Sequence, residues 1–311
     1  MIPLFCSDKI EKYGIPFIPA NFEIMRPAEL KTKIFLDSGN PEETKKALEV
    51  LGFLDGQTTN PSLIAKNPQM QQRKIEKGKL TEQEVQEFYK TVIEEIAHLL
   101  PHGSISIEVA ATEETVAEDM LSQAREMNSW IPNAHIKFPT TAEGLKAAEI
   151  FSKEGGRVNM TLVFSQDQAA AIHVATQGAA KGNIFVSPFI GRLDDIGENG
   201  LNLIQNILAM YKKQMSQVEV LAASVRTMDH FLSCLTLGAD IITAPLSILL
   251  EWANQDFPIP VEPLSMEKEG LKAIPYELLE THSTWQAYTL THPLTSKGLQ
   301  KFASDWEALL H

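Results

Sequence analysis

The chain has 311 residues, of which 44% are hydrophobic and 22% are charged, so it can bury a sizeable core as one large domain or two small ones. Its 27 basic and 40 acidic residues give a net charge of −13, and no run of lysine and arginine forms the basic stripe that nucleic acid or an anionic membrane requires. We therefore expect no nucleic acid and no membrane as partners. An anionic substrate would be held by a few local cationic side chains.

The cysteines and the first residues bear on the cellular compartment. Cys6 and Cys234 are the only cysteines and do not form a CxxC pair, which suits a reducing cytosol. The opening MIPLFC lacks the basic region and cleavage site of a secretory signal, and nowhere do about 18 apolar residues follow one another. These features predict a cytoplasmic protein.

From about residue 32 to 255 the chain repeats a short β-branched apolar run, a loop and a longer amphipathic segment. The expected strands, in chain order, are residues 31–37, 53–58, 104–109, 134–138, 157–164, 183–187, 218–224 and 239–244. Eight βα units favour a closed (β/α)8 barrel over an open doubly wound sheet, because the chain has no GxGxxG and no P-loop. We predict an α/β fold, a TIM barrel with its core at residues 32–255, in a single domain of residues 1–311.

Local signals mark where several helices begin. Asn40 followed by Pro41 is typical of an N-cap with proline at the first helical position. The two capping-box spacings found just after strands are Thr140 with Glu143 and Ser165 with Gln168. The sequence EGGRVN at 154–159 is interpreted as a helix end before a strand, and each of these signals supports the alternation of strand and helix.

Two flanks lie outside the repeat. Residues 1–31 form a proline-containing lead without periodicity, and residues 256–311 hold a loop followed by a predicted helix. The apolar residues of that helix fall at helical spacing: Leu299, Phe302, Trp306, Leu309 and Leu310. We expect this helix to pack on the barrel or on a neighbouring subunit as core, without a chemical role, and we expect a homo-oligomer.

Polar residues occur near the end of almost every predicted strand, where a barrel strand buried on both faces should be apolar. Lys137 is the least expected, since a lysine within AHIKF is costly to bury. The polar strand-end residues are Asp37, Thr58, Asn60, Glu108, Lys137, Asn159, Thr161, Ser187, Ser224 and Arg226. If the barrel prediction holds, these side chains and Arg192 converge on one rim.

Each of these residues also has an ordinary structural interpretation. A single strand-end aspartate such as Asp37 is more often a helix cap or an ion-pair partner, and Thr58 with Asn60 before Pro61 could form a turn. Each arginine could form an ion pair with a nearby aspartate and need no ligand. The candidate pairs are Arg192 with Asp194 or Asp195, and Arg226 with Asp229. The convergence of the whole set favours a functional site over these separate interpretations.

A lysine, two carboxylates and two arginines at one rim have a specific chemical use. A buried lysine amine can form a Schiff base with a ketone, which lets an adjacent carbon–carbon bond break. A carboxylate can carry the protons, and arginines can bind a phosphate. This chemistry needs no metal, and a metal site is not expected, because Pro101 separates His98 from His102 and no HExxH motif is present.

Seven motifs resemble those of the transaldolase family, in the same order along residues 32–255. They are IFLDSGNPEE, DGQTTNPSLI, IKFPTTAEGLKA, GRVNMTLVFS, VSPFIGRLDD, LAASVRT and GADIITAP. The resemblance implies a cofactor-free barrel enzyme of the pentose phosphate pathway. It would transfer a dihydroxyacetone unit from sedoheptulose 7-phosphate to glyceraldehyde 3-phosphate, so its partners would be phosphorylated ketoses and aldoses.

The resemblance also implies residue roles. Lys137 would be the Schiff-base lysine, Asp37 the general acid/base, and Glu108, with help from Thr161, would activate the catalytic water. Substrate hydroxyls or the imine would be held by Thr58, Asn60, Asn159, Ser187 and Ser224. Phe189 would also belong to the substrate-binding residues, and Arg192 and Arg226 would hold the phosphate. These roles match the chemistry argued from the residues themselves.

Two alternatives remain at this point. A fructose-6-phosphate aldolase uses the same barrel and lysine but releases dihydroxyacetone; the resemblance places glutamine at the position of Glu108 and tyrosine at that of Phe189 in such enzymes. A barrel that binds a sugar phosphate without catalysis has no need of the lysine. Gln57 and Phe138 depart from the family pattern: Phe138 should point away from the lumen by strand alternation, whereas the effect of Gln57 is left open.

Overall fold

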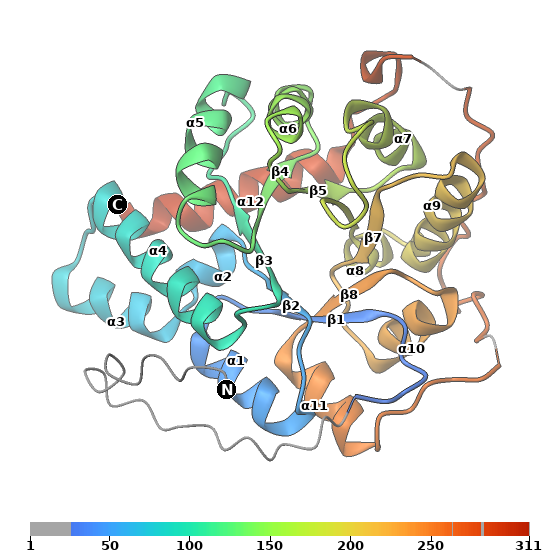
Figure 1. Cartoon of the computed structure of the whole chain (residues 1–311), viewed down its shortest axis with the longest axis horizontal. Helices are drawn as coiled ribbons and strands as arrows, with labels where there is room; N and C mark the ends of the chain where they lie inside the picture. The colour runs from blue at the N-terminus through green and yellow to red at the C-terminus, as the bar shows by residue number, and fades with distance from the viewer. Residues whose placement is uncertain (1–25, 263, 281–282, 311) are drawn as a thin grey trace, which may run out of the picture.

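Parallel strands form a closed barrel at the centre of the molecule (Figure 1). The computed structural model describes residues 26–262, 264–280 and 283–310; most of the proline-containing lead therefore lies outside the described residues. In the described part the strands are β1 (Lys33–Asp37), β2 (Gly56–Thr58), β3 (Ser104–Glu108), β4 (Ala134–Pro139), β5 (Val158–Val163), β6 (Ile184–Pro188), β7 (Glu219–Ala222) and β8 (Ile241–Ala244). Each strand pairs with the next, and β8 pairs with β1. The predicted (β/α)8 fold and all eight predicted strands are confirmed.

Helices surround the barrel (Figure 1). Their bounds are α1 (Pro41–Leu51), α2 (Pro61–Ala65), α3 (Pro68–Lys77), α4 (Glu82–Leu99), α5 (Ala117–Asn128), α6 (Ala142–Lys153), α7 (Gln166–Ala175), α8 (Ile190–Asp194), α9 (Gly200–Gln214), α10 (Met228–Leu237), α11 (Leu246–Asn254), η1 (Trp285–Ala287) and α12 (Pro293–Leu310). None of the helices among the described residues has both the length and the apolar character needed to cross a membrane.

The predicted helix starts are correct in place, with one change of capping residue. The side chain of Asn40 accepts a hydrogen bond from the backbone N–H of Glu42 at the start of α1, as expected. At α6 the cap is Thr141, not Thr140. The residue three positions after Thr141 is Gly144, which has no side chain to complete a capping box. The Glu143 carboxylate instead accepts a hydrogen bond from the backbone N–H of Ala117 at the start of α5.

Ser165 caps α7, but the predicted box is only half formed. Its hydroxyl accepts a hydrogen bond from the backbone N–H of Gln168. The Gln168 side chain does not return to Ser165; its oxygen accepts a hydrogen bond from the backbone N–H of Phe164 instead. The α6 end at Glu154 and the left-handed Gly155 agree with the interpretation of EGGRVN as a helix end.

The two departures from the family pattern both lie outside the barrel lumen. Gln57 is fully buried between β2 and α1, where it accepts a hydrogen bond from Thr44 and donates one to the backbone carbonyl of Ser38. Phe138 packs edge-on against Phe151 of α6. Gln57 therefore has a structural role: it holds α1 and the residue after Asp37 in place.

Large side chains fill the barrel below the strand ends. Phe185 packs edge-on against Phe35 and stacks on the ring of His135 at 4.1 Å between centroids. At the opposite end of the strands, Lys33 forms a 2.9 Å ion pair with Glu219. The lumen is therefore closed on one side, so any chemistry in it must take place at the carboxyl ends of the strands.

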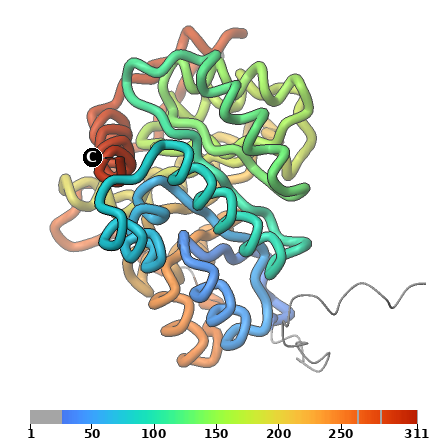
Figure 2. Tube along the Cα trace, turned by 90° about the vertical axis from the view of Figure 1, so that its left-hand side faces the viewer, coloured from blue at the N-terminus to red at the C-terminus, as the bar shows by residue number. Residues whose placement is uncertain are grey.

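The C-terminal helix α12 lies across one end of the barrel (red in Figures 1 and 2). It contacts α2, α4 and β5. Leu299, Phe302 and Leu309 are buried, and Trp306 packs against Tyr89. The helix thus packs on its own barrel, with its apolar stripe facing inward as predicted.

Candidate active site

Lys137 lies on β4 and is only 5% exposed in its side chain. Its Nζ lies 2.9 Å from Oε2 of Glu108, which is in direct register on β3. The same Nζ donates a hydrogen bond of 3.0 Å to the backbone carbonyl of Thr59. A buried charge is costly unless it is paired, so the carboxylate and the carbonyl explain how an apolar strand can hold a lysine.

Tyr89 of α4 contacts both residues that pair with Lys137. Its hydroxyl accepts a 3.0 Å hydrogen bond from the backbone N–H of Glu108 and forms another, of 2.8 Å, with the hydroxyl of Thr59. Tyr89 thereby fixes Glu108 relative to the carbonyl that receives the Lys137 amine. The sequence contains no signal for this role, because a tyrosine at helical spacing is ordinarily a core residue.

Asp37 stands at the end of β1, in register with Thr58 of β2, whose hydroxyl donates a 2.7 Å hydrogen bond to it. Burial raises the pKa of Asp37; the charge of Lys137 and the Thr58 hydrogen bond oppose the shift without cancelling it. Burial likewise raises the pKa of Glu108, against the opposing charge of Lys137. Two carboxyl groups with raised pKa beside an amine can take up and return protons.

The raised pKa of Asp37 predicts that its charge lowers stability. A folded carboxyl with a raised pKa keeps a proton that the unfolded chain has lost, so the free energy of unfolding falls as pH rises from about 4 through the folded pKa. We expect Asp37→Asn to raise Tm by about 2 °C or more at pH 8, and the gain should vanish below about pH 4. Thermal unfolding followed by circular dichroism between pH 4 and 8 measures this.

Asp195→Asn is the matched control for Asp37→Asn. The hydrogen bonds from Arg226 lower the pKa of Asp195, so its charged form is stabilising and the substitution should have the opposite sign, with a smaller effect at this exposed site. A lower Tm for Asp37→Asn at pH 8 would show that the charged Asp37 carboxylate does not lower the stability of the folded protein.

A chain of hydrogen bonds crosses the lumen beside Lys137. Asn159 of β5 donates to the hydroxyl of Ser106 at 3.0 Å and accepts from Ser187 of β6 at 2.7 Å. Thr161, two residues after Asn159, has a buried hydroxyl with no hydrogen-bond partner among the described residues. A buried, unpartnered hydroxyl is costly unless water or a ligand meets it, so Thr161 is suited to hold one.

A cavity of about 250 Å³ opens at the carboxyl ends of the strands. The predicted site residues that line it are Asp37, Thr58, Asn60, Lys137, Thr161, Ser187, Phe189, Arg192, Ser224 and Arg226. Glu108 and Asn159 are buried and do not line this cavity; Glu108 faces two smaller cavities beside α12. The fold therefore brings the predicted residues together at one end of the barrel.

Several of these residues also have local structural roles. Asn60 caps α2 through a 2.9 Å hydrogen bond from the backbone N–H of Leu63, so its structural role is a helix cap and not the turn that the sequence suggested. Thr58 bridges Asp37 and Thr243. Ser224 adopts a left-handed backbone at φ 55°, an uncommon conformation outside glycine that is typical of functional sites.

Sequence reasoning missed part of the cavity wall. The further lining residues are Ser62, Leu63, Lys66, Leu221, Ala223, Thr243, Lys301 and Phe302. Thr243 follows the same rule as the other strand-end polar residues, and the rule applied to β8 finds it. Lys301 and Phe302 lie on α12, so this helix, which was expected to pack as core, also forms part of the cavity wall.

Arg192 is held by aromatic rings and not by a carboxylate. Its guanidinium carbon lies 5.2 Å from the ring centroid of Phe189 and 5.3 Å from that of Phe302. Within the described residues Arg192 forms no ion pair, so the alternative in which Asp194 or Asp195 satisfies it does not hold. Its N–H donors are left for a ligand.

Arg226 differs in its surroundings. It forms two hydrogen bonds to the carboxylate of Asp195, at 2.6 and 2.9 Å, and nearly half of its side chain is exposed. The alternative partner Asp229 pairs with Lys268 instead. Arg226 therefore keeps a carboxylate partner on the rim of the cavity, and a phosphate would compete with Asp195 for it.

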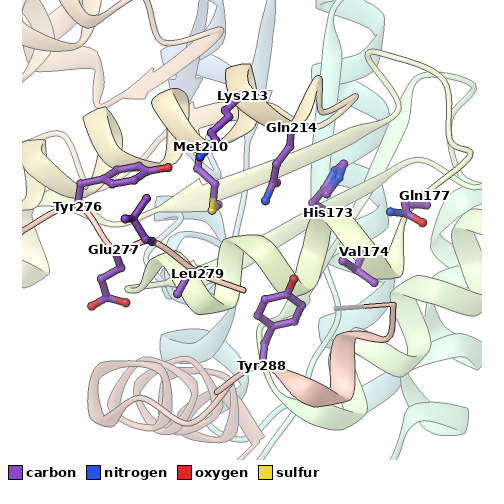
Figure 3. A pocket seen from close by; sticks show the side chains of 11 residues that line it. His173, Val174, Gln177, Met210, Lys213, Gln214, Tyr276, Glu277, Leu279 and Tyr288 are labelled. Carbon is purple, nitrogen blue, oxygen red and sulfur yellow. The ribbon is translucent and has the colours of Figure 1, made fainter. Parts of the chain in front are cut away.

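A second, larger cavity of about 420 Å³ lies between α7, α9 and the segment before α12 (Figure 3). Figure 3 shows His173, Gln214 and Tyr288 around it, and none of the predicted site residues lines it. In the part of the chain that the structure describes, no three His, Cys, Asp or Glu side chains gather as a metal site. The predicted site residues therefore lie away from this second cavity.

Comparison with known proteins identifies the family. The family model for transaldolase/fructose-6-phosphate aldolase matches residues 34–311. The chain belongs to the transaldolase/fructose-6-phosphate aldolase family. A "probable transaldolase" of Brachyspira hyodysenteriae is 38% identical over 89% of this chain and 98% of its own length. Another, from Dehalococcoides mccartyi, is 36% identical over 89% of this chain and 99% of its own length. The family resemblance seen in the motifs is thus confirmed, and it extends through α12.

Proposed function

We propose that this protein is a cofactor-free transaldolase, which transfers a dihydroxyacetone unit from sedoheptulose 7-phosphate to glyceraldehyde 3-phosphate and yields erythrose 4-phosphate and fructose 6-phosphate. The observation that carries the proposal is the buried Lys137 amine, 2.9 Å from the Glu108 carboxylate and opening on the same cavity as Asp37. A sugar-binding module needs no buried amine with a carboxylate beside it and another on the same cavity, whereas imine chemistry uses all three groups.

The proposed reaction begins at Lys137. Its unprotonated Nζ attacks the ketone carbon of the donor, and loss of water leaves a protonated imine that can accept electrons. Asp37 takes the proton of the C4 hydroxyl as the C3–C4 bond breaks, and the bonding pair moves into the imine to form an enamine. The shortened aldose phosphate then leaves.

The second half reverses these steps with a new aldehyde. The enamine carbon attacks the aldehyde of the acceptor, and Asp37 returns its proton to the new hydroxyl group. Glu108 handles the proton of the water that is lost when the imine forms and added when it hydrolyses, with the Thr161 hydroxyl holding that water. Ser187, which is oriented by its hydrogen bond to Asn159, would hold a sugar hydroxyl, and Arg192 with Arg226 would hold the phosphate.

A coupled assay tests the proposal. Purified protein receives sedoheptulose 7-phosphate or fructose 6-phosphate, with and without an acceptor aldose phosphate. We expect rapid sugar conversion only when the acceptor is present. Free dihydroxyacetone formed at the same rate without an acceptor would mean an aldolase, and no conversion under any condition would mean a barrel without this activity. The role in the pentose phosphate pathway, the cytoplasmic location and the homo-oligomer belong to the same proposal.

A further inference from the structure

The C-terminal helix α12 contributes one of the two aromatic faces that hold Arg192. Phe189 comes from the barrel, at the end of β6, but Phe302 lies over a hundred residues later. Aromatic faces attract a guanidinium and restrict its position without occupying its N–H donors. Arg192 is therefore held in place and still able to bind an anion with its N–H groups.

A glycine on the same helix makes room for this arrangement. A Cβ added at Gly298 would lie 2.4 Å from Nη1 of Arg192 and 2.5 Å from Cδ2 of Leu162, which is closer than atoms can approach. The position of α12 relative to β5 is fixed, because the hydroxyl of Thr295 donates a 2.9 Å hydrogen bond to the backbone carbonyl of Leu162. Any larger residue at position 298 would push the guanidinium from its place.

The two arginines therefore depend on different parts of the chain. Arg226 is oriented by Asp195 on the barrel rim. Within the described residues, no residue of α12 forms a hydrogen bond, ion pair or ring contact with Arg226. Arg192 has no carboxylate partner in the described residues and depends on Phe189, Phe302 and the space at Gly298. A change in α12 should thus affect one arginine and leave the other in place.

We propose that Phe302 and Gly298 of α12 are positioning residues that set the preference of this site for phosphorylated sugars by holding Arg192. The inference rests on the proposed function, in which Arg192 binds the substrate phosphate. Its consequence is that the C-terminal helix contributes directly to substrate selection, in addition to covering the barrel.

The test compares fructose 6-phosphate with fructose, which differ only in the phosphate. Phe302→Leu keeps apolar bulk but removes the ring, and we expect the ratio of kcat/KM for the phosphorylated to the unphosphorylated sugar to fall about tenfold, mainly through KM for fructose 6-phosphate. Phe302→Tyr keeps the ring and should keep the ratio at the wild-type value. Gly298→Ala should lower the ratio. Arg192→Ala removes the guanidinium itself and should give the largest fall in the ratio.

Leu309→Ala is the matched control, because Leu309 is a buried residue of α12 that does not line the cavity. It should lower Tm without changing the ratio. If Phe302→Leu and Leu309→Ala change the ratio equally, or if Phe302→Tyr lowers it too, Phe302 only supports the helix and the inference is overturned.

Calorimetric titration with inorganic phosphate separates this inference from the proposed function. We expect wild-type protein to bind phosphate more tightly than Phe302→Leu, by the same factor as in the kinetic ratio, whether or not any sugar is converted. If wild type binds phosphate and Phe302→Leu binds it equally well, the positioning role is wrong even in an active transaldolase. If no sugar is converted but the difference in phosphate binding remains, only the proposed reaction is wrong.

Discussion

Borohydride added together with fructose 6-phosphate is expected to fix a three-carbon unit on Lys137. Borohydride reduces an imine to a stable amine, so the trapped adduct records the covalent intermediate. Lys137 is the expected position because its Nζ is buried and faces the cavity beside two carboxylates, which can carry the protons of imine formation. Mass spectrometry of the intact protein detects the adduct, and peptide mapping locates it.

Lys33 is the matched control for this experiment. Its Nζ also lies 2.9 Å from a glutamate, Glu219, but at the opposite end of the strands, where large side chains close the lumen. Lys33→Met should leave trapping intact. Lys137→Met should abolish it and lower kcat by on the order of 10³-fold or more. A wild-type protein that converts the sugar but remains unmodified, or an adduct on another lysine, would contradict the Schiff-base role of Lys137.

The arrangement of the site residues is predictable because a parallel barrel places all strand ends at one rim. The β-branched runs predicted the strands, and the period of two identified Asn159 and Thr161 as neighbours on one face. Lys137 was identifiable because a lysine in an apolar strand requires a partner. The order of the strands placed it on the same rim as Glu108, whereas the direct register of the two residues on β3 and β4 is seen only in the structure.

Contacts between elements far apart in the chain were not predictable in the same way. Helical periodicity shows that α12 has an apolar face, but it does not show which surface that face meets. For the same reason the ring of Phe302 beside Arg192 and the hydroxyl of Tyr89 beside Glu108 were missed. The pairing of Arg226 with Asp195 also depends on the geometry of two loops, and sequence spacing suggested Asp229 instead.

Glu108→Gln is expected to slow turnover and to raise the share of dihydroxyacetone released to water. Turnover should fall by on the order of 10²-fold, because the amide cannot accept the protons of water and carbinolamine. The share released should rise because the family resemblance places glutamine at this position in the fructose-6-phosphate aldolases, which release dihydroxyacetone instead of transferring it. The exchange leaves Lys137, whose Nζ lies 2.9 Å from the Glu108 carboxylate, in place.

The measurement is the ratio of dihydroxyacetone to transfer product at a fixed concentration of acceptor. Glu219→Gln is the control, because it removes a carboxylate from a lysine pair of the same 2.9 Å separation at the closed end of the barrel. It should change Tm and leave the ratio at the wild-type value.

Glu108→Gln has a buried lysine beside a neutral amide, so part of its slower turnover can come from lower stability. Lower stability, however, reduces transfer and release together. The ratio therefore reports on the carboxylate of Glu108 separately from stability. If the ratio stays at the wild-type value while turnover falls, Glu108 is a structural partner of Lys137 and its carboxylate does not help to retain the dihydroxyacetone unit.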